Sequence, residues 1–180
     1  MSNFYHRLLF KRMGWSEQVT IPHRDKCIIC VAPHTSNWDF IIGQLYYRSL
    51  GRTAGFLMKK EWFFFPMGYL MRALGGIAIQ RDKKMRMTDA MAAEFDKHES
   101  LCVAITPEGT RSYNPDWKKG FYFIAEKAGI PIVFAALDFK KKEIILGDQF
   151  IPTGDVDADM TQIKAYYKET NAKFPEKFGM

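Results

Sequence analysis

Short apolar strands that alternate with helical stretches are the feature of this sequence that most constrains its fold. Glycine or proline punctuates most of the boundaries between them, as is typical of strands and helices joined by tight turns. The expected strands are Cys27–Ala32, Phe56–Met58, Ile77–Gln80, Leu101–Ile105, Ile132–Phe139 and Glu143–Leu146, and the expected helices are Asn37–Leu50, Met67–Leu74, Thr88–His98, Gly120–Ala128 and Met160–Thr170. This order predicts an α/β fold, a mixed and largely parallel sheet covered by helices, with its site at the carboxyl ends of the strands.

The length of 180 residues predicts a single domain over residues 1–180. No uninterrupted run of about 20 apolar residues is present. The closest stretch is Trp62–Ile79, which Pro66, Arg72 and several glycines interrupt, so it predicts interfacial contact with a membrane rather than a transmembrane helix. Within residues 1–20, the stretch Phe4–Met13 predicts a short amphipathic helix, which either docks on anionic lipid or packs on the domain surface.

The formal net charge of +6 indicates an anionic partner: nucleic acid, an anionic lipid surface or a phosphorylated substrate. Three cysteines and the absence of a signal-peptide pattern predict a cytoplasmic protein with reduced thiols. Cys27 and Cys30 form a C-x-x-C, but an odd spacing on a strand places the two side chains on opposite faces. We therefore expect no zinc or redox site there, no other metal site and no bound cofactor.

The stretch from Cys27 to Phe40 delivers a histidine to the end of a strand. Pro33 ends the strand ladder because it has no N–H to donate, and His34 follows it directly. Ser36 is a good N-cap with Asp39 three residues later, so a helix should begin there and its first turn should bring the Asp39 carboxylate back to His34. Such a pair makes His34 a candidate general base. Asp39 has an alternative role, in which it only favours the helix N-terminus.

A second polar segment, Thr106–Ser112, follows the strand at 101–105 and reads T-P-E-G-T-R-S. Gly109 allows a tight turn that presents Glu108, Thr110 and Arg111 together, and a guanidinium beside hydroxyl and backbone donors suits a phosphate. Glu108 is expected to hold Arg111 in place when the site is empty. The alternative is a solvated turn with a simple ion pair.

Four blocks in order, H-T-S-N-W-D, G-G-I-A-I-Q-R, T-P-E-G-T-R-S and G-I-P-I-V, resemble those of the glycerolipid (1-acylglycerol-3-phosphate, lysophospholipid) acyltransferases. The resemblance covers roughly residues 27–137. It implies a glycerol-3-phosphate acyltransferase-like domain in which His34 is the base and Asp39 its orienting partner. It also implies that the substrate is bound by Arg81, Glu108, Gly109, Thr110, Arg111 and Lys119. Pro131 of the fourth block would shape the site or the acyl channel. Pro33, where the family often has Asn, and Phe134, where it often has a second Pro, depart from the pattern.

The resemblance implies transfer of a fatty acyl group from acyl-CoA or acyl-carrier protein to the hydroxyl of a lyso-lipid, with 1-acylglycerol-3-phosphate as the first expectation. The protein would then be peripheral on the inner face of the membrane and would not bind nucleic acid. All three cysteines fall inside strands, so a covalent acyl-enzyme is not expected. The alternatives are an acceptor that is an amino-acid lyso-lipid without phosphorus, a basic lipid- or nucleic-acid-binding module without catalysis, and a hydrolase in which His34 activates water.

Overall fold

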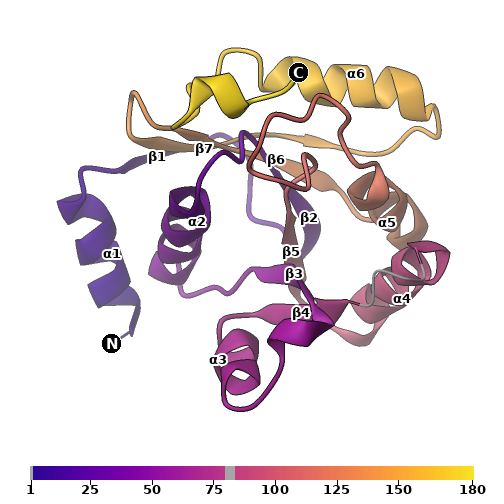
Figure 1. Cartoon of the computed structure of the whole chain (residues 1–180), viewed down its shortest axis with the longest axis horizontal. Coiled ribbons are helices and arrows are strands. Elements are labelled where there is room, and N and C mark those ends of the chain that lie inside the picture. The colour runs from indigo at the N-terminus through magenta and orange to yellow at the C-terminus, as the bar shows by residue number, and fades with distance from the viewer. Residues whose placement is uncertain (1, 80–83) are drawn as a thin grey trace.

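One seven-stranded sheet forms the centre of the protein, with strand order β1-β7-β6-β2-β5-β3-β4 (Figure 1). The structure is a computed structural model that describes residues 2–79 and 84–180. Its strands are β1 (Ser16–Val19), β2 (Lys26–Val31), β3 (Gly55–Lys59), β4 (Gly76–Ile79), β5 (Leu101–Ile105), β6 (Ile132–Asp138) and β7 (Glu143–Phe150). Its α-helices are α1 (Ser2–Arg12), α2 (Asn37–Ser49), α3 (Met67–Ala73), α4 (Lys84–Lys97), α5 (Gly120–Ala128) and α6 (Val156–Tyr166), and short 3₁₀ turns lie at η1 (Lys60–Trp62) and η2 (Pro175–Lys177).

Every neighbouring strand pair is parallel except β6 with β7, which run antiparallel through the turn that follows Asp138. The prediction of a mixed, largely parallel sheet covered by helices is therefore confirmed. β6 is buried at all of its positions, as expected for a strand with helices on both faces.

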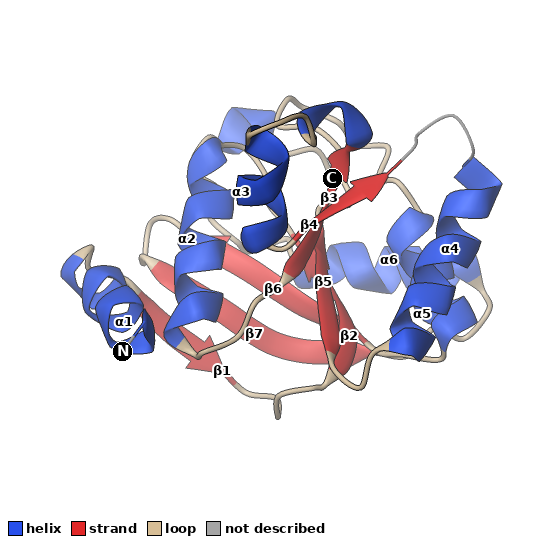
Figure 2. Ribbon diagram, turned by 90° about the horizontal axis from the view of Figure 1, so that it is seen from below, coloured by secondary structure: helices blue, strands red, loops and turns tan. Residues whose placement is uncertain are grey.

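Two layers of helices enclose the sheet (Figure 2). α4, α5 and α6 pack on one face, where Phe95, Ile124 and Ile163 join the strand residues in one apolar core. α1 and α2 cover the other face, where Phe10 and Tyr46 belong to a second core. Cys30 lies in the first core and Cys27 in the second, so the C-x-x-C cysteines do point to opposite faces.

Some element boundaries differ from those that the sequence predicts. β1 was not expected, because all four of its residues are exposed and carry no alternating apolar pattern; its pairing with β7 alone makes it a strand. β7 runs four residues beyond Leu146, along β6, and α6 begins at Val156 rather than Met160 because Asp155 caps it by accepting the Ala158 N–H.

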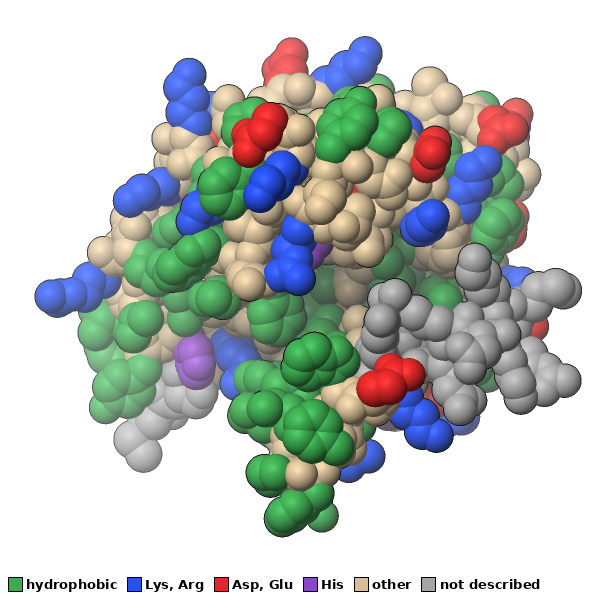
Figure 3. Space-filling view, viewed as in Figure 1, with side chains coloured by type: hydrophobic (Ala, Val, Ile, Leu, Met, Phe, Trp, Pro, Cys, Tyr) green, Lys and Arg blue, Asp and Glu red, His purple; other side chains and the backbone are tan. Residues whose placement is uncertain are grey.

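Apolar side chains are exposed on two projecting parts of the protein, over α1 and over η1 and α3 (Figure 3). Phe10 anchors α1 in the core while its other apolar residues, Phe4, Tyr5, Leu8 and Leu9, face outward. Around η1 and α3 the exposed set is Trp62, Phe64, Phe65, Tyr69 and Leu70, with Phe65 82% exposed. No helix among the described residues has both the length and the apolar character needed to cross a bilayer.

Candidate functional site

The site lies where β2 and β5 end side by side. These strands are parallel neighbours, and the register pairs Cys30 with Ile105 near their carboxyl ends. The loop that carries His34 and the loop that carries Glu108 therefore leave the same edge of the sheet at adjacent positions. This edge is the usual ligand-binding position of an open α/β sheet.

The predicted approach of Asp39 to His34 is present: His34 Nδ1 lies 3.3 Å from Asp39 Oδ2. The carboxylate is buried and is held in place by the start of α2, since its Oδ2 accepts the N–H groups of Thr35 and Ser36, both at 2.7 Å. Ser36 Oγ donates to the other carboxylate oxygen at 3.0 Å. The capping interaction that the sequence predicts is therefore the device that fixes the carboxylate beside the ring.

The imidazole is oriented but only weakly bonded on its Nδ1 side. Nδ1 is buried, and at 3.3 Å it is not aligned for a regular hydrogen bond to Asp39. The His34 side chain is 18% exposed, and because Nδ1 is covered, the accessible part of the ring lies elsewhere on it.

Glu108 lies behind the histidine, fully buried, and its Oε1 accepts the backbone N–H of His34 at 2.7 Å. Its Oε2 has no hydrogen-bond partner among residues 2–79 and 84–180. Burial raises the pKa of Glu108 from 4.5 to about 7, the His34 N–H opposes that increase, and the charge of Asp39 adds to it. The expected ion pair between Glu108 and Arg111 is wrong: the glutamate turns inward to the histidine loop, and Arg111 is left exposed.

The rest of the Thr106–Ser112 segment forms the tight turn that the sequence predicts. Gly109 adopts a left-handed conformation with φ of 68°, which glycine tolerates best, and its N–H donates to Thr106 O at 3.1 Å. Thr110 Oγ1 accepts the N–H of Ser112 at 3.2 Å. Arg111 has no ion-pair partner among the residues that the structure describes, so its guanidinium is available to an anion.

Another predicted binding residue, Lys119, stands apart from this arrangement. Lys119 precedes α5 and forms an ion pair with Asp157 of α6 at 2.6 Å. An incoming phosphate would have to compete with that carboxylate. Arg81, two positions after the last residue of β4 in the sequence, lies outside the described residues.

The structure adds a part of the site that the sequence did not indicate, the C-terminal segment Asn171–Met180. The Phe174 N–H donates to Thr35 Oγ1 at 3.3 Å, next to the histidine. Gly179 O accepts Trp117 Nε1–H at 3.0 Å, in the loop that continues from Glu108. Contacts of this kind depend on residues more than 60 positions apart, so no local pattern could reveal them.

Tyr167, the C-cap residue of α6, also contacts this edge of the sheet. Its buried hydroxyl donates a hydrogen bond to Cys30 O in β2 at 2.7 Å. Both site loops are thus attached to one stretch of chain that follows the last helix. Within residues 2–79 and 84–180, no three His, Cys, Asp or Glu side chains gather closely enough to hold a metal ion.

Comparison with known proteins identifies similar chains. A family model described as Acyltransferase matches residues 16–137. The chain is 32% identical over 118 residues to a 1-acyl-sn-glycerol-3-phosphate acyltransferase of Chlamydomonas reinhardtii, covering 63% of this chain and 34% of that protein. It is 37% identical over 83 residues to the human 1-acyl-sn-glycerol-3-phosphate acyltransferase beta, covering 43% of this chain and 30% of that protein. The chain thus spans about a third of the length of these curated relatives.

A solved structure shares the fold. The crystal structure of the 1-acyl-sn-glycerophosphate acyltransferase PlsC from Thermotoga maritima superposes with a TM-score of 0.60, over 94% of this chain and 80% of that one. The two sequences are 17% identical, so this likeness concerns the fold. The superposition extends well past residue 137, where the family match ends.

Proposed function

Because the chain belongs to the glycerolipid acyltransferase family, we propose that it transfers a fatty acyl group from an acyl thioester to the free hydroxyl of a lyso-lipid. The observation that carries this proposal is the His34–Asp39 pair at the carboxyl end of β2, with Nδ1 and Oδ2 3.3 Å apart. The first acceptor to consider is 1-acylglycerol-3-phosphate, the substrate in the names of the curated relatives.

His34 would act as the general base of this reaction. It takes the proton of the acceptor hydroxyl, and the oxygen attacks the thioester carbonyl. The buried Asp39 carboxylate stabilises the imidazolium that forms. When the tetrahedral intermediate collapses, the carbon–sulfur bond breaks and the imidazolium returns the proton to the thiolate. The products are an ester and a free thiol, and no acyl-enzyme is needed.

The acceptor phosphate would bind at the turn that follows β5. Arg111 is exposed there beside the hydroxyls of Thr110 and Ser112, and Gly109 keeps the turn narrow. Arg81, which follows β4 in the sequence and lies outside the described residues, would supply a second guanidinium. A planar guanidinium binds a phosphate through paired hydrogen bonds, which fits this assignment.

Membrane contact would bring the acceptor to this site. The exposed aromatic residues of η1 and α3 and the apolar residues of α1 offer two points of contact with a bilayer surface. Lys11 and Arg12 in the last turn of α1 add attraction for anionic lipid.

The test is transfer of a labelled acyl group from acyl-CoA and from acyl-carrier protein to a panel of lyso-lipids. The panel should contain lysophosphatidic acid and amino-acid lyso-lipids, and wild type is compared with His34→Ala. We expect product with lysophosphatidic acid, and we expect His34→Ala to reduce it by about 10²-fold to 10⁴-fold. His98→Ala is the matched control, since that exposed histidine pairs with Glu94 of α4 and lies outside the site.

Three results would contradict the proposal. Release of free fatty acid without acceptor would identify a hydrolase. Lipid binding with no transfer from either donor would favour a binding module. Transfer that survives His34→Ala would remove His34 from the chemistry.

A further inference from the structure

A cavity of about 280 Å³ lies beside the start of α2, and none of the residues assigned so far to the proposed reaction lines it. Its walls come from four parts of the chain, and the lining residues are Met13, Trp15, Trp38, Ile42, Phe139, Lys142 and Lys173. Neither His34 nor Glu108 belongs to this lining. Its volume is close to the lower end of the range for small-molecule pockets.

The lining combines flat aromatic rings with positive charge. Trp15 and Phe139 pack edge to face with ring centroids 5.1 Å apart. Lys173 Nζ lies 4.9 Å from the centre of the Trp38 ring and 5.7 Å from that of Phe139. An ammonium group is attracted to the faces of aromatic rings, so the charge of Lys173 lies among the rings of the lining.

Both charged residues in the lining are lysines, and no carboxylate lines the cavity. Lys173 has no ion-pair partner among the described residues, and Lys142 Nζ donates to Met13 O at 3.3 Å. The nearby Asp138 is buried, and its oxygens already accept from the Lys141 N–H and from Asn171 Nδ2. The cavity is therefore complementary to an anion that carries a flat ring.

The cavity is connected to the catalytic loop through the C-terminal segment. Lys173 precedes Phe174, whose N–H bonds to Thr35 Oγ1, and Trp38 stands in the first turn of α2, close in sequence to His34. Lys142 and Lys173 both lie beyond the family match, which ends at residue 137. The site is thus made partly from residues outside that match.

We propose that this cavity binds the adenosine phosphate portion of an acyl-CoA donor, an inference that rests on the proposed acyl transfer. The adenine ring stacks against the aromatic lining, as bases do on aromatic side chains, and Lys142 and Lys173 contact the phosphates. A bare acyl chain would leave both lysines facing an apolar ligand without a counter-charge, which is costly. Acyl-carrier protein, which has no adenosine, would not use this cavity.

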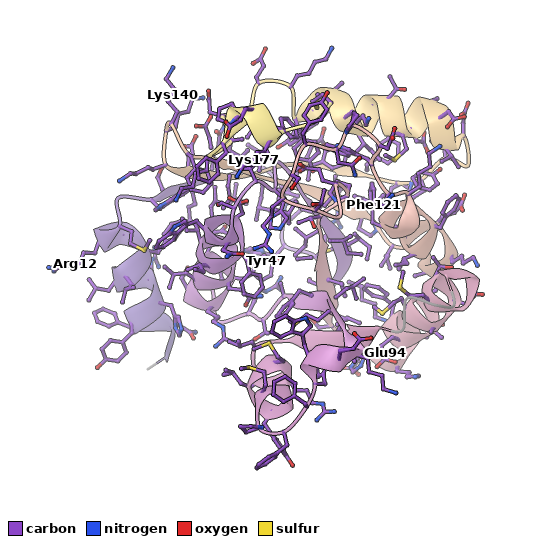
Figure 4. All side chains as sticks on the ribbon, in the orientation of Figure 1. Arg12, Tyr47, Glu94, Phe121, Lys140 and Lys177 are labelled. Atoms are coloured by element: carbon purple, nitrogen blue, oxygen red, sulfur yellow. The ribbon has the colours of Figure 1, made fainter. Side chains whose placement is uncertain are left out.

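Direct binding tests the proposal without requiring transfer. Adenosine 3′,5′-bisphosphate is titrated while tryptophan fluorescence is followed, and Trp38→Phe identifies the reporter ring. We expect Lys142→Gln/Lys173→Gln to weaken binding by about tenfold or more, since each lysine contributes a charged contact. The matched control is Lys140→Gln/Lys168→Gln, which removes the same charge from exposed positions outside the lining; Lys140 points away at the edge of the molecule (Figure 4).

Steady-state kinetics supply the second measurement. The Lys142→Gln/Lys173→Gln variant should raise the KM for acyl-CoA about tenfold. It should leave kcat, and the KM for an S-acyl-pantetheine donor, unchanged, because that donor lacks the nucleotide.

The inference is overturned if the bisphosphate binds both double variants equally. It is also overturned if dodecanoate, and not the nucleotide, changes the fluorescence of Trp38. Nucleotide binding without any acyl transfer would support this cavity while contradicting the proposed function. Transfer from acyl-CoA with an unchanged KM in Lys142→Gln/Lys173→Gln would support the proposed function while contradicting nucleotide binding in this cavity.

Discussion

Asp39 uses one carboxylate both to cap α2 and to face His34. Asp39→Asn separates these roles, because the amide oxygen can still accept the Thr35 and Ser36 N–H groups but carries no charge. We expect kcat for acyl transfer to fall by about 10²-fold or more. The free energy of unfolding should change by about 1 kcal/mol or less in urea titrations. Asp155→Asn, which alters the N-cap of α6, is the control and should leave kcat unchanged. If Asp39→Asn kept the kcat of wild type, the prediction would be wrong, and capping α2 would be the one remaining role of the carboxylate.

Glu108 predicts a particular dependence of stability on pH. The folded protein holds its proton more tightly than the unfolded chain, so the group favours folding below about pH 4.5 and loses that contribution as the pH rises through about 7. The glutamine of Glu108→Gln cannot ionise. Between about pH 4.5 and pH 7, the free energy of unfolding of this variant should therefore rise relative to that of wild type, by at most roughly 3 kcal/mol. Urea unfolding from pH 4 to 8 measures the difference. A difference between Glu108→Gln and wild type that stays constant over this pH range would contradict the prediction.

For single residues, the sequence predicts that His34 and Asp39 lie close together, because the end of one strand and the cap of the next helix place them. The sequence does not predict that the Glu108 side chain points inward. It depends on β5 lying beside β2, which brings residues 74 positions apart into contact, and a string such as P-E-G-T-R cannot convey that.

Among the elements, those with strong apolar patterns are predicted well. The strand Leu101–Ile105 and the helix Gly120–Ala128 have the predicted boundaries, and Gly129 ends that helix in a left-handed conformation. β1 has no such pattern and exists through its partner β7. The C-terminal segment is likewise defined by tertiary contacts, with Trp117 and Thr35 as its attachment points.

Gly179→Ala tests the attachment of the C-terminal segment. A Cβ at this position would collide with the carbonyl carbon of Asn114, a backbone atom, so the segment would have to shift. We expect a loss of roughly 1–3 kcal/mol in the free energy of unfolding, together with lower acyl transfer. The control is Gly43→Ala, whose Cβ meets nothing within 4 Å and which should stabilise α2 by about 0.5–1 kcal/mol. Equal melting temperatures for Gly179→Ala and wild type would show that the segment is not held as described.

For the whole molecule, the two exposed apolar regions predict reversible binding to bilayers. Trp62→Ser/Phe64→Ser/Phe65→Ser removes three exposed aromatic residues around η1. We expect its partition coefficient to anionic vesicles to fall by tenfold or more, since each buried aromatic contributes on the order of 1 kcal/mol or more. Co-sedimentation with vesicles measures this. Tyr113→Ser/Ile151→Ser changes exposed apolar residues elsewhere and is the control. Unchanged sedimentation of the triple variant would exclude this region as the contact.

The position of the C-terminal segment also sets the order in which a growing chain gains the parts of the site. β2 and β5 are made early, yet the chain that ties their loops together comes only with residues 171–179. All seven strands of the sheet precede these residues in the sequence. Assembly of the site therefore depends on a segment that lies outside the sheet and is made after every one of its strands.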